Sequence, residues 1–146
     1  MDSITKHIPG ISLLLVEDDK PTLDCLATIL SKKYPEATIH TACDGKTGLD
    51  LFKEYLPEII ITDVNMPEMH GMQMASEIRA IEPEAKFIIL SGDNGMPSRQ
   101  KTDERGFTPD LFIMKPVVFQ DLFSAIEQCL DTITPRNMTK NLQACG

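Results

Sequence analysis

The chain is short of aromatic residues, of positive charge and of long apolar stretches. Its 146 residues include no Trp, and aromatic residues make up 5%, which leaves little material for a surface that stacks nucleotide bases. Lys and Arg number 14 against 22 Asp and Glu, so the formal net charge is −8. Nucleic-acid binding needs clustered cations that neutralise phosphates. We therefore expect no direct contact between this chain and DNA or RNA.

Export and membrane signals are also lacking. No secretory signal precedes the first apolar stretch, and no stretch is long enough to cross a bilayer. The four cysteines, Cys25, Cys43, Cys129 and Cys145, have neither CxxC spacing nor the spacing of a zinc site. Cys25 and Cys129 fall in helical patterns, where a free cysteine is typically a small buried residue. These features predict a cytoplasmic protein without membrane contact.

What the chain does have is a set of four short apolar runs that each end in a chemically useful residue. Glu17, Asp18 and Asp19 follow residues 11–16, Asp63 follows 59–62, Ser91 follows 87–90, and Lys115 follows 111–114. Apolar runs with little alternation are typical of parallel strands that are covered on both faces. Ligand sites in such sheets lie beyond the carboxyl ends of the strands. We therefore expect acids, a hydroxyl and an ammonium to converge at one edge.

Helical patterns separate the apolar runs. Asp19 is placed to cap a helix with Pro21 in its first turn. A further strand is predicted over residues 38–42, and helices over 45–55, 72–81 and 118–133. This alternation predicts a three-layer α/β fold, a doubly wound (βα)5 with a five-stranded parallel sheet in the order 2-1-3-4-5. The first and third strands are neighbours in that order, which brings Asp18 and Asp63 together.

Two segments lack a helical apolar face. Residues 97–105, PSRQKTDER, have none, so a short exposed segment is expected where a fourth helix would lie. Residues 134–146 show no periodicity and are predicted to be a C-terminal tail or linker remnant. The expected organisation is an N-terminal extension over residues 1–9, one domain over 10–133, and this tail.

The strand-end residues suit phosphoryl chemistry around a metal ion. Buried carboxylates that lie close together repel one another, and Mg²⁺ with its preference for oxygen ligands relieves the repulsion. Pro67 rigidifies a turn that can aim the Asn65 carbonyl at the metal. A carboxylate beside a bound cation, such as Asp63, can attack phosphorus and form an aspartyl phosphate. Lys115 can supply charge and Ser91 a hydroxyl to the phosphoryl oxygens.

The motifs LLLVEDD, IIITDVNMPEMHG, FIILSG and LFIMKP resemble those of the receiver domain of bacterial two-component response regulators. The resemblance covers about residues 10–133 and implies the flavodoxin-like fold of CheY-like domains. It implies that Asp63 is the phosphoacceptor and that Lys115 pairs with the phosphoryl group. It further implies that Ser91 and Phe112 are the switch residues, which move when the domain is phosphorylated.

The resemblance also implies a cofactor and partners. Mg²⁺, with Mn²⁺ as a substitute, would be bound by Asp18, Asp63, the main-chain carbonyl of Asn65 and, through water, Glu17. Asn65 and Asp93 match positions that tune dephosphorylation; both are small and polar, so we expect moderate to fast loss of the phosphoryl group. The phosphoryl donor would be a sensor histidine kinase or a histidine phosphotransfer protein. The phosphorylated domain would act on a downstream protein target or on an output domain. A phosphorylation-dependent homodimer is compatible with the family. The domain would catalyse only its own phosphorylation and dephosphorylation.

Three alternatives stay open at the level of sequence. A haloacid-dehalogenase-type phosphatase also uses a strand-end Asp, a hydroxyl, a Lys and Mg²⁺, but it needs an acid where Asn65 stands. A receiver-like interaction module without phosphorylation is a second alternative, which the complete set of acids, hydroxyl and lysine disfavours. A copper site is the third, because soft ligands gather at Met66, Met69, His70, Met72 and Met74. Methionines more often fill gaps beneath a helix.

Overall fold

The computed structural model describes residues 11–64, 71–91 and 110–145, with side chains described for 11–64, 73–91 and 110–132. Its strands form one parallel sheet in the order β2-β1-β3-β4-β5. The elements follow the chain as β1 (Ser12–Val16), α2 (Lys20–Lys33), β2 (Thr38–Ala42), α3 (Gly45–Tyr55), β3 (Ile59–Asp63), α4 (Gly71–Ile81), β4 (Lys86–Ser91), β5 (Leu111–Met114) and α5 (Phe119–Cys145). The predicted fold class and strand order are confirmed.

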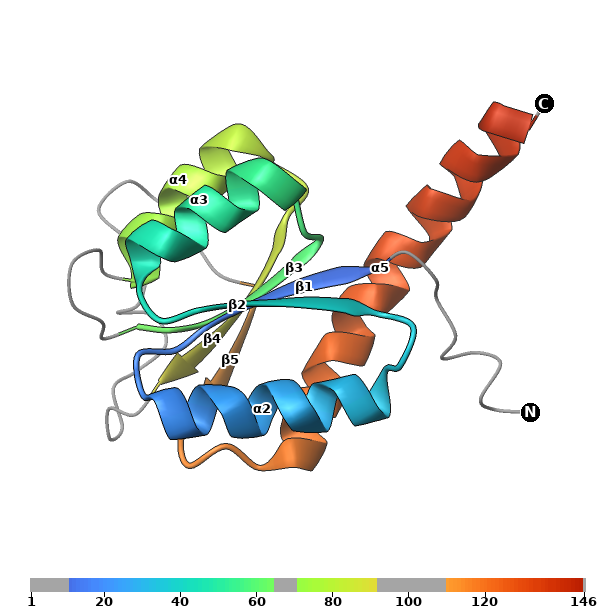
Figure 1. Ribbon diagram of the computed structural model, residues 1–146. Helices are drawn as coiled ribbons and strands as arrows, with labels where there is room; N and C mark the ends of the chain where they lie inside the picture. Colours follow the sequence, from blue (N-terminus) through green and yellow to red (C-terminus); the bar gives the residue numbers. More distant parts are fainter. Residues whose placement is uncertain (1–10, 65–70, 92–109, 146) are drawn as a thin grey trace.

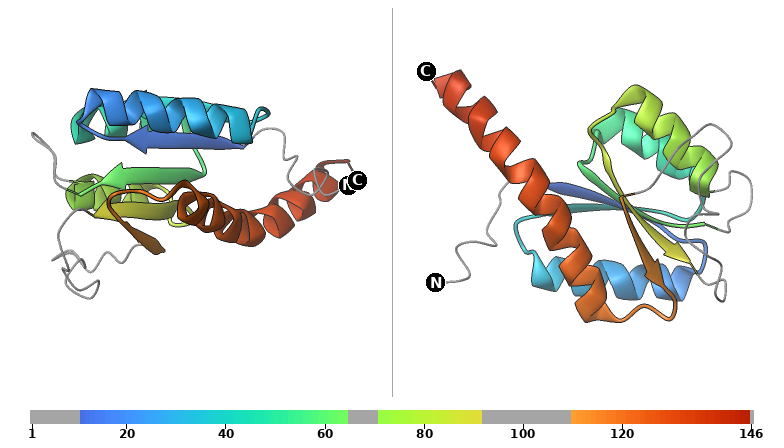
Figure 2. Two further views of the ribbon diagram at one scale, coloured as in Figure 1. Left: turned by 90° about the horizontal axis from the view of Figure 1, so that it is seen from below. Right: turned by 180° about the vertical axis from the view of Figure 1, so that it is seen from behind.

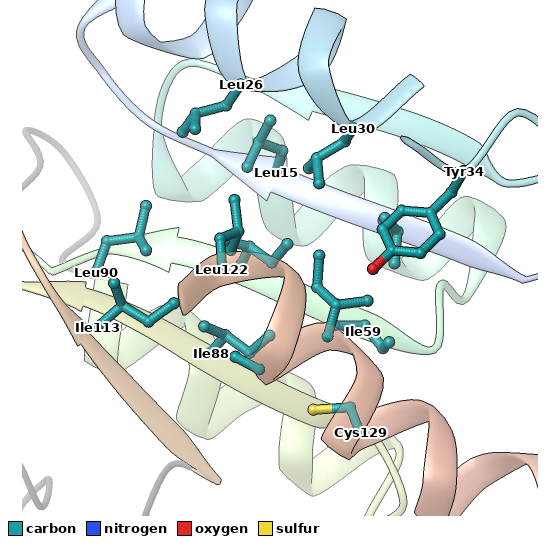
Figure 3. Packing of buried hydrophobic residues seen from close by; sticks show 14 of the residues in the cluster. Leu15, Leu26, Leu30, Tyr34, Ile59, Ile88, Leu90, Ile113, Leu122 and Cys129 are labelled. Carbon is teal, nitrogen blue, oxygen red and sulfur yellow. The ribbon is translucent and has the colours of Figure 1, made fainter. Parts of the chain in front are cut away.

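Helices cover both faces of the sheet. Figure 1 shows α3 and α4 on one face and α2 and α5 on the other, and the views of Figure 2 agree. Each face carries its own cluster of buried apolar side chains. Figure 3 shows the cluster on the α2 and α5 side, where Leu30, Ile88 and Leu122 come together from α2, β4 and α5. Burial on both faces explains why the central strands are nearly continuous apolar runs.

Helix α2 begins as the sequence predicts. The side chain of Asp19 accepts a hydrogen bond from the Thr22 N–H at 3.1 Å, which satisfies one of the unpaired donors at a helix N-terminus. The buried side of α2 consists of Leu23, Leu26 and Leu30. Cys25 falls between these leucines and is exposed, so the prediction that it is buried is wrong. Cys129 on α5 is buried, as predicted.

A glycine brings α3 close to its neighbours. A Cβ atom at Gly48 would lie 2.8 Å from the Met74 sulfur and 3.0 Å from a Val16 methyl carbon, closer than van der Waals contact allows. Met74 is fully buried in the cluster on this face, which favours packing over copper binding for this methionine. Met66, Met69 and His70 lie outside the described residues, and the Met72 side chain is not described.

The last helix is longer than its apolar pattern indicates. It continues to Cys145, so the expectation that it ends near residue 133 is wrong, and its final part projects away from the sheet (Figure 1). The predicted end follows the apolar residues of α5 that pack on the sheet, and Leu130 is the last of these among the residues whose side chains the structure describes. The predicted N-terminal extension and the polar segment 97–105 lie outside the described residues.

None of the helices in the described ranges combines the length and hydropathy needed to cross a bilayer.

Candidate functional site

The acids of β1 and β3 come together because these strands are neighbours. Leu13 to Val16 of β1 pairs in parallel with residues 59–62 of β3, so both strands end at the same edge of the sheet. Glu17 and Asp18 directly follow β1, and Asp63 is the last residue of β3. Carboxylate oxygens of these three residues all lie within 4.8 Å of one another. The predicted meeting of Asp18 and Asp63 is therefore present.

Two of the three acids are withdrawn from solvent. Glu17 is 1% exposed and Asp63 is 6% exposed, whereas Asp18 is exposed. Burial raises the pKa of the Glu17 carboxyl, because the charged form loses hydration and lies near the charge of Asp63. The Asp19 N–H donates to Glu17 Oε2 at 3.1 Å and opposes that rise. The result is a compact group of three carboxylates, two of which are buried.

Lys115 supplies the positive charge at this site. Its ammonium donates to Glu17 Oε1 at 3.0 Å and to Asp63 Oδ2 at 3.1 Å. Burial would lower the pKa of the lysine, but the hydrogen bonds to Glu17 and Asp63 outweigh burial, so the pKa is raised and the ammonium stays charged. The backbone N–H of Lys115 donates to the Ser91 carbonyl at 2.8 Å, which fixes the residue at the end of β5 beside β4.

Ser91 places a hydroxyl at the neighbouring strand end. It is the last residue of β4 and is 2% exposed. Its hydroxyl has no hydrogen-bond partner among the described residues. A buried polar group without a partner costs about 1–3 kcal/mol, so such groups are rare in folded proteins unless a ligand uses them. The hydroxyl is therefore available to a group that binds at this edge.

The remaining oxygen of Asp63 is also held in place. The Val64 N–H donates to Asp63 Oδ1 at 2.7 Å, and the Thr62 hydroxyl donates to the Asp63 carbonyl at 2.9 Å. One carboxylate oxygen thus faces a backbone donor and the other faces Lys115. This arrangement orients the carboxylate before any other group arrives.

The structure brings together most of the predicted site. Glu17, Asp18, Asp63 and Lys115 share one cluster, and Ser91 ends the adjacent strand. Phe112 is half-buried and packs against the cluster on the α3 and α4 face. Asn65 and Asp93 lie outside the described residues.

One functional contact has no signal in the sequence pattern. The pattern predicts Glu17 as an acid near the metal, but it does not predict that Lys115 contacts Glu17 as well as Asp63. The sequence pattern also does not predict the hydrogen bond from the Asp19 N–H to Glu17. It indicates only that three acids follow β1. These contacts depend on how the loop after β1 turns.

A comparison with models of known protein families shows which family the chain belongs to. The family model described as "Response regulator receiver domain" matches residues 13–127. The chain belongs to this family. This assignment agrees with the sequence resemblance and replaces the haloacid-dehalogenase alternative.

Curated relatives of the chain are longer than the chain itself. Transcriptional regulatory protein GlrR of Escherichia coli (strain K12) is 33% identical over 130 residues, which cover 88% of this chain and 28% of GlrR. Cell cycle response regulator CtrA of Brucella ovis is 29% identical over 140 residues, covering 90% of this chain and 59% of CtrA. The chain therefore spans less than two thirds of the length of either relative.

Two solved structures match this chain over nearly their whole length. The N-terminal domain of an uncharacterized protein from Wolinella succinogenes is 31% identical with a TM-score of 0.76, over 87% of this chain and 99% of that one. A CheY-like response regulator receiver domain from Methanospirillum hungatei is 25% identical with a TM-score of 0.76, over 86% and 98%. The receiver fold thus accounts for most of the chain.

Proposed function

We propose that Asp63 accepts a phosphoryl group from a sensor histidine kinase or a histidine phosphotransfer protein, in a reaction that requires Mg²⁺. The observation that carries this proposal is the Lys115 ammonium 3.1 Å from Asp63 Oδ2, at the edge where three acids gather. The domain catalyses only its own phosphorylation and dephosphorylation. Its role is to convert the modification into a change of surface that another protein or an output domain recognises.

The residues at this edge fit a divalent cation. Three carboxylates with oxygens within 4.8 Å of one another are the hard ligands that Mg²⁺ prefers, and two of them are too buried for water to relieve their repulsion. Asp18 and Asp63 would hold the ion directly and Glu17 through water. The Asn65 carbonyl, the remaining proposed ligand, lies outside the described residues. Mg²⁺, or Mn²⁺ in its place, supplies positive charge next to the acids and the phosphoryl oxygens.

The transfer itself needs positioning more than chemistry from the protein. An oxygen of Asp63 forms a bond to phosphorus while the bond from phosphorus to the donor's leaving atom breaks, and the leaving group keeps the electron pair. The Val64 N–H orients the carboxylate for this attack. Lys115 donates to a phosphoryl oxygen as negative charge develops there. Its raised pKa keeps it protonated for this role.

The response to phosphorylation begins at Ser91. Its buried hydroxyl, which has no partner among the described residues, would donate to a phosphoryl oxygen, and Phe112 would shift from its half-buried position toward the core. Both changes bias an existing equilibrium between two conformations. The surface around β5 and α5 would then differ for a downstream partner. The small polar residues Asn65 and Asp93 would leave attacking water unshielded, so the phosphoryl group is lost at a moderate to fast rate.

The test is phosphoryl uptake from acetyl phosphate, a small donor that removes the need for a kinase. The wild-type chain with Mg²⁺ should gain one phosphoryl group that is labile to acid and to alkali, as an acyl phosphate is, and Asp63→Asn should gain none while keeping its circular dichroism spectrum. Asp24→Asn is the matched control, because Asp24 is an exposed acid on α2 and should leave uptake unchanged. Undiminished uptake by Asp63→Asn would refute the site, and no uptake by the wild type would favour the interaction module without phosphorylation.

A further inference from the structure

Lys115 directly follows strand β5, and few side chains of β5 are buried enough to hold the strand in register. It is an edge strand of four residues that pairs with β4. Of these residues only Ile113 is buried, and Met114 is 51% exposed. Side-chain burial therefore fixes β5 less firmly than it fixes the central strands. The question is which contacts set the position of Lys115 along the sheet.

Hydrogen bonds bracket β5 at both ends. At its end near the site, the Lys115 N–H donates to the Ser91 carbonyl at 2.8 Å. At its start, the Asp110 N–H donates to the Phe87 carbonyl at 3.2 Å, and the Asp110 carboxylate accepts from the Phe87 N–H at 2.8 Å. Asp110 thus binds both backbone groups of one residue of β4. This double contact defines the register at the far end of the strand.

A salt bridge also connects Asp110 to α4. The Arg79 guanidinium donates to Asp110 Oδ2 at 3.1 Å, and its central carbon lies 5.0 Å from the centre of the Phe87 ring. The two side chains of the ion pair are only 29% and 32% exposed. One carboxylate therefore joins α4, β4 and β5. Charge-assisted bonds of this kind are stronger than neutral ones.

We propose that Asp110 is the positioning residue for Lys115. The inference rests on the proposed phosphoryl transfer to Asp63. Strands rise about 3.3 Å per residue, so a slip or fraying of β5 by even part of that distance would move the Lys115 ammonium out of reach of Asp63 and Glu17. Asp110 does not touch the reacting atoms. It acts by holding the strand that presents the lysine.

A double-mutant cycle with Lys115 separates positioning from general stability. Asp110→Ala removes both contacts of the carboxylate and should slow phosphoryl uptake about tenfold, since small misplacements at a site are costly. Asp110→Asn keeps an oxygen for the Phe87 N–H and should lose less. In a Lys115→Met background, Asp110→Ala should cause no further loss. An equal fold-loss in both backgrounds would overturn the proposal.

Amide hydrogen exchange gives a readout that does not depend on phosphorylation. Asp110→Ala should accelerate exchange at the Lys115 and Phe87 amides, while amides of β1 stay protected. Asp24→Ala, which removes an exposed helical ion pair, should change neither. Unchanged Lys115 exchange in Asp110→Ala would refute the positioning role even if the wild type takes up phosphate. Faster Lys115 exchange in Asp110→Ala, together with no phosphoryl uptake by the wild type, would uphold the positioning role and refute the transfer.

Discussion

The ammonium nitrogen of Lys115 lies 3.1 Å from a carboxylate oxygen of Asp63, although the two residues are 52 positions apart in the chain. The same nitrogen lies 3.0 Å from Glu17. Both acids are almost completely buried. Among the described residues, Lys115 is the cation that forms ion pairs with both Glu17 and Asp63. It therefore contributes to the stability of the site as well as to its proposed chemistry.

Lys115→Met should destabilise the protein in the presence of a metal chelator. Glu17 and Asp63 would each lose a donor while they remain buried, and a buried group left without its partner costs about 1–3 kcal/mol. Urea unfolding in the chelator measures the effect. Lys20→Met is the control, because Lys20 pairs with Asp24 on the surface with both side chains 64% exposed and exposed pairs contribute about 0–1 kcal/mol. Equal losses in the two variants would contradict this role for Lys115.

Mg²⁺ should raise the melting temperature of the wild type, because a ligand that binds the folded state stabilises it. Asp18→Asn should reduce this increase, since Asp18 belongs to the acidic cluster and its exposure makes the substitution mild for folding. Thermal denaturation at increasing Mg²⁺ measures the shift. Asp24→Asn should retain the full increase. A full increase in Asp18→Asn would exclude Asp18 as a ligand.

Ser91→Ala should leave the stability of the unphosphorylated protein nearly unchanged or slightly higher. The hydroxyl is buried without a partner among the described residues, so its removal breaks no hydrogen bond to a described residue and relieves part of the cost of burying a polar group. Thr62→Val is the matched control, because the buried Thr62 hydroxyl donates to the Asp63 carbonyl and its loss should destabilise. Urea unfolding compares the two. Destabilisation of Ser91→Ala as large as that of Thr62→Val would show that the Ser91 hydroxyl has a structural partner.

Cys129 should make the protein less stable as the pH rises above about 9. Burial raises the pKa of its thiol from 9.0 to about 12, so between these values the folded state retains a proton that the unfolded state loses. The stability this group contributes is fully present below the unfolded pKa and is lost as pH rises toward the folded one, with a slope of up to about 1.4 kcal/mol per pH unit. Urea unfolding from pH 8 to about 10 measures the slope.

Cys129→Ala should remove this part of the pH dependence, whatever its effect on the absolute free energy of unfolding. An identical slope in the wild type and in Cys129→Ala would contradict the assignment.

The sequence is sufficient to predict the sheet and the edge at which the acids, the hydroxyl and the lysine gather. Strands covered on both faces leave continuous apolar runs, and the parallel connection rules then fix the order and bring Asp63 beside β1. The cap at Asp19 follows from local chemistry alone. These features depend on short-range patterns or on general topology, which a single sequence carries.

Other features depend on tertiary contacts that no local pattern encodes. One is the contact between Lys115 and Glu17, and another is the hydrogen bond from the Phe87 N–H to Asp110. Both join residues that are far apart in the chain. The exposed position of Cys25 depends on which side of α2 the leucines occupy. The length of α5 could not be read from apolar spacing, because its final part projects from the sheet (Figure 2).

The most direct test of the central claim is to locate the phosphoryl group on the chain. Borohydride reduces an aspartyl phosphate to homoserine, which leaves a permanent mass change at the acceptor that peptide mass spectrometry can assign. After treatment with acetyl phosphate and Mg²⁺, the wild-type chain should carry homoserine at position 63 and nowhere else. Homoserine at Asp18 or Asp19 instead, or no reduction product from a phosphorylated sample, would contradict the assignment of Asp63 as the acceptor.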